Sequence, residues 1–170
     1  MPDKLETSPF IQYLMSLSER ENRGALAALR RGLGQPPGTV AAMYPYVVPW
    51  LPADARQEAA YYMVAALLAS HPAVGGRGNL GEAFRRARGN EPNDAIERRF
   101  TTLLAAHPDD LFDYLRQAVS FLKSKDVSVD WNQLFYDVQH WSYPTHTVQK
   151  AWARAYWGSE HREQPENKEK

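Results

Sequence analysis

The chain has 170 residues, with 20 basic and 20 acidic side chains and no cysteine. Its length suits one domain or two small bundles that share an interface. The absence of cysteine excludes disulfides, cysteine-ligated zinc and a thiol nucleophile, and it fits a cytoplasmic location. No apolar run approaches the roughly 20 residues of a membrane span, and the opening MPDKLETSPF lacks the pattern of a signal peptide.

Hydrophobic spacing predicts a series of helices in the first half of the chain. They are expected over residues 9–18, 22–34, 53–70 and 79–88, with a short helix and then an extended segment over 39–50. Asn22 is the predicted N-cap of the second of these helices, and the last one is predicted to start at Asn79. Residues 59–69 are apolar around most of the helix circumference, which predicts a central, buried helix.

The second half is predicted to form helices over residues 94–107, 108–125, 130–141 and 144–157. Asp94 is the predicted N-cap of the first of these, with Glu97 three residues later as in a capping box. Nearly every apolar pattern has a period of 3.6 residues, so the predicted fold class is all-α, with about eight or nine helices in two packed helical bundles. The predicted parts are 9–90 and 91–158, between a flexible tail at 1–8 and a disordered polar tail at 159–170.

The predicted helix over 94–107 carries an arginine pair. Its apolar stripe comprises Ile96, Phe100, Leu103 and Leu104. Arg98 points nearly opposite to this stripe, while Arg99 lies on its flank. Ordinary surface charge is the more common explanation for an isolated pair of this kind. A functional role for the pair is therefore favoured only if other helices of the chain also present arginine side chains outward.

Two further helices are basic and present arginine outward. Arg31 points away from the apolar face of its predicted helix and Arg30 lies at the edge, while the predicted helix over 79–88 directs three more arginines mostly outward, Arg85, Arg86 and Arg88. Residues 9–158 contain thirteen arginines but three lysines, whereas residues 109–137 have a net charge of −3. Because guanidinium forks match phosphate and carboxylate, this bias favours phosphate contacts or ion pairs.

Several sequence patterns resemble ligand-binding or metal-binding motifs but also have simpler structural explanations. Residues 76–81 match G-x-G-x-x-G, but a helix is predicted to precede them where a dinucleotide site needs a strand. A surface loop is the simpler interpretation, and a phosphate held by backbone N–H groups and Arg77 is the alternative. Asp137, His140 and His146 leave a metal site open, although packing or surface roles are more common. No catalytic residue, metal or cofactor is predicted.

The C-terminal part is dense in aromatic side chains. Stacking on nucleobases beside Lys150 and Arg154 is one interpretation, and a role in the core or in a subunit interface is favoured over it. The set comprises Trp131, Phe135, Tyr136, Trp141, Tyr143, Trp152, Tyr156 and Trp157.

The order of short motifs resembles one known family over about residues 9–158. The motifs are FIQYL near the start, GALAALRRG at 24–32, YPYV at 44–47, GNLGEAF at 78–84, ERRF at 97–100, VDWNQLFYDVQHW at 129–141 and QKAWARAYW at 149–157. Together they resemble the small subunit, or CasB family, of Cascade, the type I-E CRISPR surveillance complex.

The resemblance implies an all-helical protein without known catalytic activity. It implies two copies lying head to tail, beside the large subunit and the backbone subunits that hold the CRISPR RNA, with basic residues holding the target and displaced DNA strands of the R-loop. Arg30, Arg31, Arg98 and Arg99 match its motifs as nucleic-acid contacts. Arg85, Arg86 and Arg88 extend this set because their region is basic. The alternative is a protein-only adaptor whose arginines pair with partner subunits.

Overall fold

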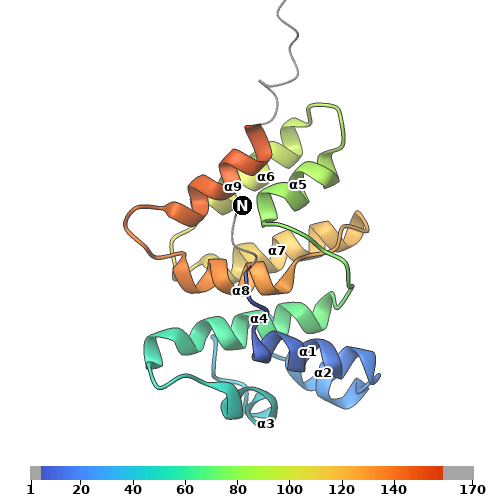
Figure 1. Cartoon of the computed structure of the whole chain (residues 1–170), viewed down its shortest axis with the longest axis vertical. Coiled ribbons are helices and arrows are strands. Elements are labelled where there is room, and N and C mark those ends of the chain that lie inside the picture. Colours follow the sequence, from blue (N-terminus) through green and yellow to red (C-terminus); the bar gives the residue numbers. More distant parts are fainter. Residues whose placement is uncertain (1–4, 159–170) are drawn as a thin grey trace, which may run out of the picture.

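The computed structural model describes residues 5–158, so the predicted disordered tail at 159–170 lies outside the described residues. Within 5–158 the chain forms nine α-helices and no strand, which confirms the all-α prediction (Figure 1). The helices are α1 (Pro9–Glu19), α2 (Arg23–Arg30), α3 (Tyr44–Val47), α4 (Glu58–Ser70), α5 (Leu80–Arg88), α6 (Asp94–Leu104), α7 (Leu111–Ser124), α8 (Trp131–His140) and α9 (Thr147–Trp157).

The segment around the two prolines of residues 39–50 differs from its prediction. Residues Ala41–Met43 and Val48–Trp50 form 3₁₀ turns on either side of α3, so the expected extended segment is wrong. Pro45 and Pro49 each lie in the first turn of a helical segment, where the missing N–H has no intrahelical partner to lose. The helix predicted from residue 53 begins only at Glu58, after a further 3₁₀ turn.

Helix α4 lies at the centre of the molecule, as its apolar composition predicts. It contacts α1 and α2 on one side and α7 and α8 on the other. Residues 62–69 are all buried, and those from 64 to 69 are without measurable exposure. Three of the eight are alanine, and their small side chains let the surrounding helices approach closely. The N-terminal helices and helices α7 and α8 are therefore packed around one shared helix.

The helices are arranged in successive levels along the long axis (Figure 1). Helices α1, α2 and α3 lie at one end, α5, α6 and α9 at the other, and α4, α7 and α8 between them. The buried apolar side chains form one continuous core from Phe10 to Tyr156. Helix α5 packs most extensively against α9, and the division of the chain at residue 90 stays a prediction.

Residues 5–8 precede α1 without helical structure. The Ser8 backbone N–H donates a hydrogen bond to the Asn132 side chain at 2.7 Å, and that side chain donates to the Glu6 carbonyl oxygen at 3.1 Å. Helix α8 thus contacts the start of the described chain. Residues 1–4 of the predicted tail lie outside the described part.

Candidate nucleic-acid interface

Helix α6 begins one residue earlier than a cap at Asp94 would place it, because Asn93 is its cap. The Asn93 side-chain oxygen accepts a hydrogen bond from the Ile96 N–H at 3.1 Å, and Asn93 has the extended backbone of an N-cap. The assignment of the cap to Asp94 is therefore wrong. Asp94 is the first helical residue instead, where its negative charge complements the helix dipole together with Glu97.

The apolar stripe of α6 fastens the helix to its neighbours. Phe100 is fully buried, its ring stacks on Tyr156 of α9 at 4.7 Å between centroids, and it lies 5.0 Å from the ring of Phe84 in α5. Ile96 and Leu103 are buried on the same side. This packing fixes the direction in which the opposite face of α6 points.

The arginine pair of α6 is exposed, which confirms the predicted orientation. Arg98 lies on the outer face. The guanidinium of Arg99 lies over the ring of Phe121 in α7, with Cζ 4.9 Å from the ring centroid. A cation over an aromatic face keeps its N–H edges directed outward, so Phe121 orients Arg99 without using its hydrogen-bond donors.

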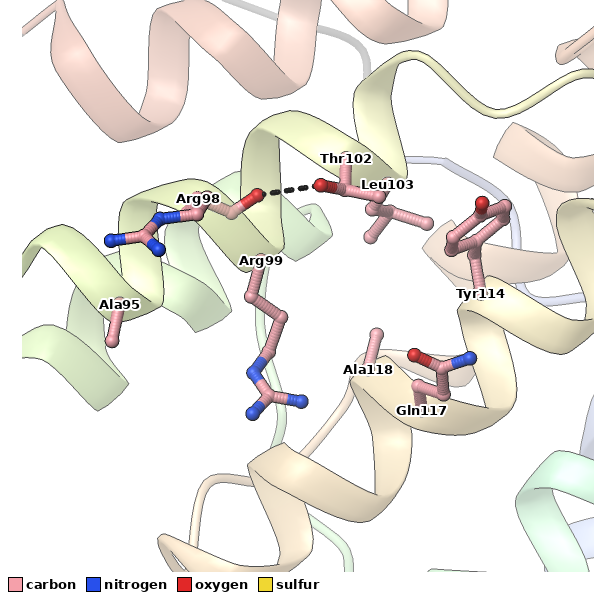
Figure 2. Close-up of a pocket in the computed structure, with 8 residues that line it drawn as sticks. All are labelled: Ala95, Arg98, Arg99, Thr102, Leu103, Tyr114, Gln117 and Ala118. Carbon is pink, nitrogen blue, oxygen red and sulfur yellow. Dashed lines mark hydrogen bonds between the residues drawn. The ribbon is translucent and has the colours of Figure 1, made fainter.

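A pocket of about 320 Å³ lies between α6 and α7 beside this pair (Figure 2). Thr102 forms part of its wall, and its hydroxyl donates to the Arg98 carbonyl oxygen at 2.9 Å. The lining residues from α6 are Ala95, Arg98, Arg99, Thr102 and Leu103, and those from α7 are Tyr114, Gln117 and Ala118. The pocket therefore combines two cations with neutral polar and apolar groups.

Arg116 of α7 extends the basic character of α6. Arg99 and Arg116 line one further hollow, of about 570 Å³, together with the acidic Asp113 and neutral side chains. On its other side Arg116 reaches the chain just after α2: a Cβ built on Gly34 would meet the Arg116 Nη1 atom at 2.6 Å. Arg116 was not predicted as a site residue, because its segment is acidic overall. Its spacing with Lys123, two turns further along the same helix, could have revealed the shared face.

The C-terminal end of α4 joins α2 to α7 through two cations. Arg30 of α2 donates from Nη1 to the Ala69 carbonyl oxygen at 3.4 Å, and Lys123 of α7 donates from Nζ to the Ser70 carbonyl oxygen at 2.8 Å. The last carbonyls of a helix lack intrahelical partners and carry partial negative charge, so both contacts are favourable. Lys123 is a second residue that the sequence analysis missed.

Shared hollows and hydrogen bonds to the end of α4 thus connect five cations of α2, α6 and α7. We name this set the α7 basic surface: Arg30, Arg98, Arg99, Arg116 and Lys123. Helix α2 and the C-terminal ends of α4 and α7 lie on one side of the molecule, at the right of Figure 1. Arg31 follows Arg30 and is exposed at the end of α2. The structure therefore brings both motif-matched arginine pairs to the neighbourhood of α7.

The arginines of α5 have other surroundings. Arg86 is exposed and donates to the Arg77 carbonyl oxygen at 3.2 Å, while Arg85 is half-buried. Arg88 is also half-buried, with its guanidinium 4.8 Å from the centre of the Tyr156 ring. The three were predicted to point mostly outward, and Arg88 departs from this prediction because it packs between α5 and α9. The hollow beside Arg85 and Arg86 is lined by Glu82, Gly89 and Asn90.

The G-x-G-x-x-G segment is a packed connection between α4 and α5. A Cβ on Gly76 would overlap the backbone of Val129, and one on Gly81 would overlap the carbonyl oxygen of Trp152. The Gly78 N–H donates to the Asp130 carboxylate at 3.3 Å. Close backbone approach thus accounts for two of these glycines, and helix α4 precedes the segment as predicted.

The residues considered for a metal site make other contacts. Asp137 accepts a hydrogen bond from the Trp152 indole at 2.7 Å, and Nδ1 of His140 lies 2.7 Å from the Tyr136 carbonyl oxygen. His146 precedes α9 with a left-handed backbone. Across residues 5–158 no group of three or more histidine or acidic side chains is placed to hold a metal ion.

The aromatic side chains divide between the core and the surface. Tyr136 and Tyr143 are exposed, at 41% and 51%. The others of the set are buried or half-buried, which confirms the predicted core role for most of them. In the described part of the chain, no helix is long and apolar enough to cross a membrane.

The fold and the candidate site place the chain in a class of all-helical proteins with an aromatic-rich core and an arginine-rich surface. The family model of the CRISPR-associated protein Cse2 matches residues 25–157, and the chain belongs to this family. The Cse2 protein of Thermus thermophilus is 36% identical over 166 residues, which cover 94% of this chain and 95% of that protein.

Solved structures have the same fold. The CasB protein of M. ruber has a TM-score of 0.76 at 29% identity, with 93% of this chain and 97% of that chain covered. A chain of a CRISPR RNA-guided surveillance complex has a TM-score of 0.73 at 29% identity, with 90% and 94% covered.

Proposed function

We propose that this chain is a non-catalytic subunit of a Cascade-type CRISPR surveillance complex. In this role it binds the sugar-phosphate backbone of nucleic acid through the α7 basic surface and stabilises the R-loop formed by CRISPR RNA, target strand and displaced strand. Its proposed partners are a second copy of itself, the large subunit and the subunits that hold the CRISPR RNA. The proposed site of action is the cytoplasm.

The observation that carries this proposal is the linkage of Arg30, Arg98, Arg99, Arg116 and Lys123 across α2, α6 and α7. Phosphate contacts from arginine and lysine supply most of the sequence-independent affinity for nucleic acid. Such contacts position a duplex or strand but do not read bases. Membership of the Cse2 family, and likeness to a chain of an RNA-guided complex, support the same assignment.

Removing the α6 pair tests the proposal. In a reconstituted complex, the double variant Arg98→Ala and Arg99→Ala is expected to bind target DNA more weakly at 0.15 M salt. Each lost phosphate contact reduces the slope of log affinity against log salt by about 0.7 for a single strand and about 0.9 for a duplex. The expected change for the pair is therefore about 1.4 for a single strand and about 1.8 for a duplex. Binding titrations over a range of salt concentrations measure both quantities.

Arg56→Ala is the matched control. The Arg56 side chain is 90% exposed, pairs with Asp54, and lies before α4, at the end opposite to Arg30. A helix of thirteen residues separates the two regions by about 20 Å. Thermal unfolding of each variant checks the fold, because Arg99→Ala also removes a cation–π contact. Unchanged affinity and salt slope in a folded double variant would overturn the proposal.

The protein-only adaptor is separated by footprinting of the displaced strand. If the chain holds the R-loop, nuclease protection of that strand is expected to fall when the chain is omitted and to fall partly with the Arg98 and Arg99 double variant. Protection that is the same with and without the chain favours the adaptor.

A further inference from the structure

The pocket between α6 and α7 has two chemically different ends (Figure 2). Arg98 and Arg99 lie toward one end, while the ring of Tyr114 and the amide of Gln117 lie toward the other. Leu103 lies between these groups. A phosphate group alone would contact only the cationic end and would leave the neutral end unoccupied.

The neutral end offers hydrogen-bonding groups in both directions. The Gln117 amide supplies donors and an acceptor. The Thr102 hydroxyl uses its hydrogen on the Arg98 carbonyl oxygen, so its lone pairs remain acceptors at the wall of the pocket. Tyr114 is half-buried and adds a flat ring with a hydroxyl at its tip. These are the groups that hold a planar heterocycle by its face and its edges.

The cationic end is organised before any ligand arrives. The Arg99 guanidinium lies over Phe121, which restrains its long side chain while the N–H edges stay available. A restrained donor fork suits a phosphate group, which accepts two parallel hydrogen bonds.

The volume limits the occupant. At about 320 Å³ the pocket is at the small end of the range for small-molecule sites, so it suits one nucleotide and not a stacked duplex. Bases in a duplex are paired and stacked, whereas those of a single strand are free to lie against aromatic side chains.

We propose that the α6–α7 pocket holds one unpaired nucleotide of a bound strand, with its phosphate at Arg98 and Arg99 and its base against Tyr114 and Gln117. This inference rests on the proposed function and adds a base contact to a surface that otherwise reads only the backbone. The base end selects single-stranded over duplex nucleic acid and is tolerant of sequence, because every base has a π-face.

Tyr114→Leu tests the base contact in the reconstituted complex. It is expected to weaken single-strand affinity about tenfold, the effect typical of losing one stacked base, without altering the salt slope. Duplex affinity is expected to stay the same. Tyr114→Phe keeps the ring and is expected to retain most of the affinity. Thermal unfolding of both variants checks the fold, and equal single-strand affinity for wild type and Tyr114→Leu overturns the proposal.

Photocrosslinking locates the base. Target DNA with 5-iodouracil in place of thymine is expected to crosslink to the α7 peptide that contains Tyr114, and Tyr114→Leu is expected to lose this product. Crosslinks confined to other peptides of the chain would contradict the proposal. If the Tyr114 crosslink persists while the Arg98 and Arg99 double variant leaves the salt slope unchanged, phosphate anchoring fails and the base site stands. If the salt slope changes but no Tyr114 crosslink forms, the phosphate contact stands and the base site is contradicted.

Discussion

Substituting Gly81 by alanine is expected to lower the free energy of unfolding by about 2 kcal/mol. Gly81 lies in the first turn of α5, where the helix crosses α9, and an added methyl group would overlap the Trp152 carbonyl oxygen. Relief requires a shift of the α9 backbone. Because Trp152 is fully buried and its indole donates to Asp137, that shift disturbs α8 as well.

The sign of this effect separates packing from helix propensity. In an unconstrained helix, alanine is more favourable than glycine by about 1 kcal/mol, so Gly81→Ala would stabilise the protein if the space were open. Gly24→Ala provides that comparison, because the nearest atom to a Cβ on Gly24 in α2 is the Asn22 side-chain oxygen at 3.9 Å. We expect Gly24→Ala to leave stability unchanged or to raise it slightly.

Urea and thermal unfolding measure both variants. For a chain of this size, 2 kcal/mol corresponds to a fall in Tm of about 4–8 °C. A Tm for Gly81→Ala at or above that of wild type would mean that α5 and α9 are less tightly packed than described.

Only part of the role of Gly81 follows from the local sequence. Helix α4 precedes the pattern G-x-G-x-x-G, as predicted, where a dinucleotide site needs a strand. The purpose of its glycines was not predictable, because the atoms that exclude a side chain belong to Val129 and Trp152, far along the chain. Local spacing identifies small residues but does not identify what approaches them.

At the candidate site too, the local sequence predicted some features and not others. The orientation of Arg98 followed from the 3.6-residue period of α6, because Phe100 and its neighbours determine which face is buried. The cap of that helix was misplaced by one residue, because Asn93 and Asp94 are both good caps and sequence does not decide between them. Arg116 was missed because the net charge of a long segment conceals a single basic helix face.

The contribution of Asp137 to the free energy of unfolding is expected to fall as pH rises from about 4 to 7. This carboxylate is 4% exposed, and burial raises its pKa to about 6, although hydrogen bonds from Trp152 and Gln133 and the nearby His140 oppose the rise. The unfolded chain has a pKa near 3.8 at this residue. Between the two values the folded protein binds more protons than the unfolded chain, so stability decreases with pH by up to about 3 kcal/mol.

Asp137→Asn is the variant that isolates this effect. The amide oxygen can still accept from the Trp152 indole, which lies 2.7 Å from Oδ2, and the Gln133 amide, 2.9 Å from Oδ1, can rotate to present its own oxygen. We therefore expect the variant to match wild type near pH 4 and to be the more stable protein at pH 7. Urea unfolding at several pH values measures the difference, and a parallel pH profile for the two proteins would contradict the assignment.

Asp137→Ala distinguishes the charge from the hydrogen bonds. It also removes the titrating group, but it leaves the buried Trp152 N–H without this acceptor, which costs about 1–3 kcal/mol at every pH. Its stability is expected to be lower than that of Asp137→Asn by a constant amount and to show the same weak dependence on pH. The Asp137 carboxyl group thus joins α8 to α9 by accepting the hydrogen bond of the buried Trp152 indole. Burial disfavours the ionised form of this same group.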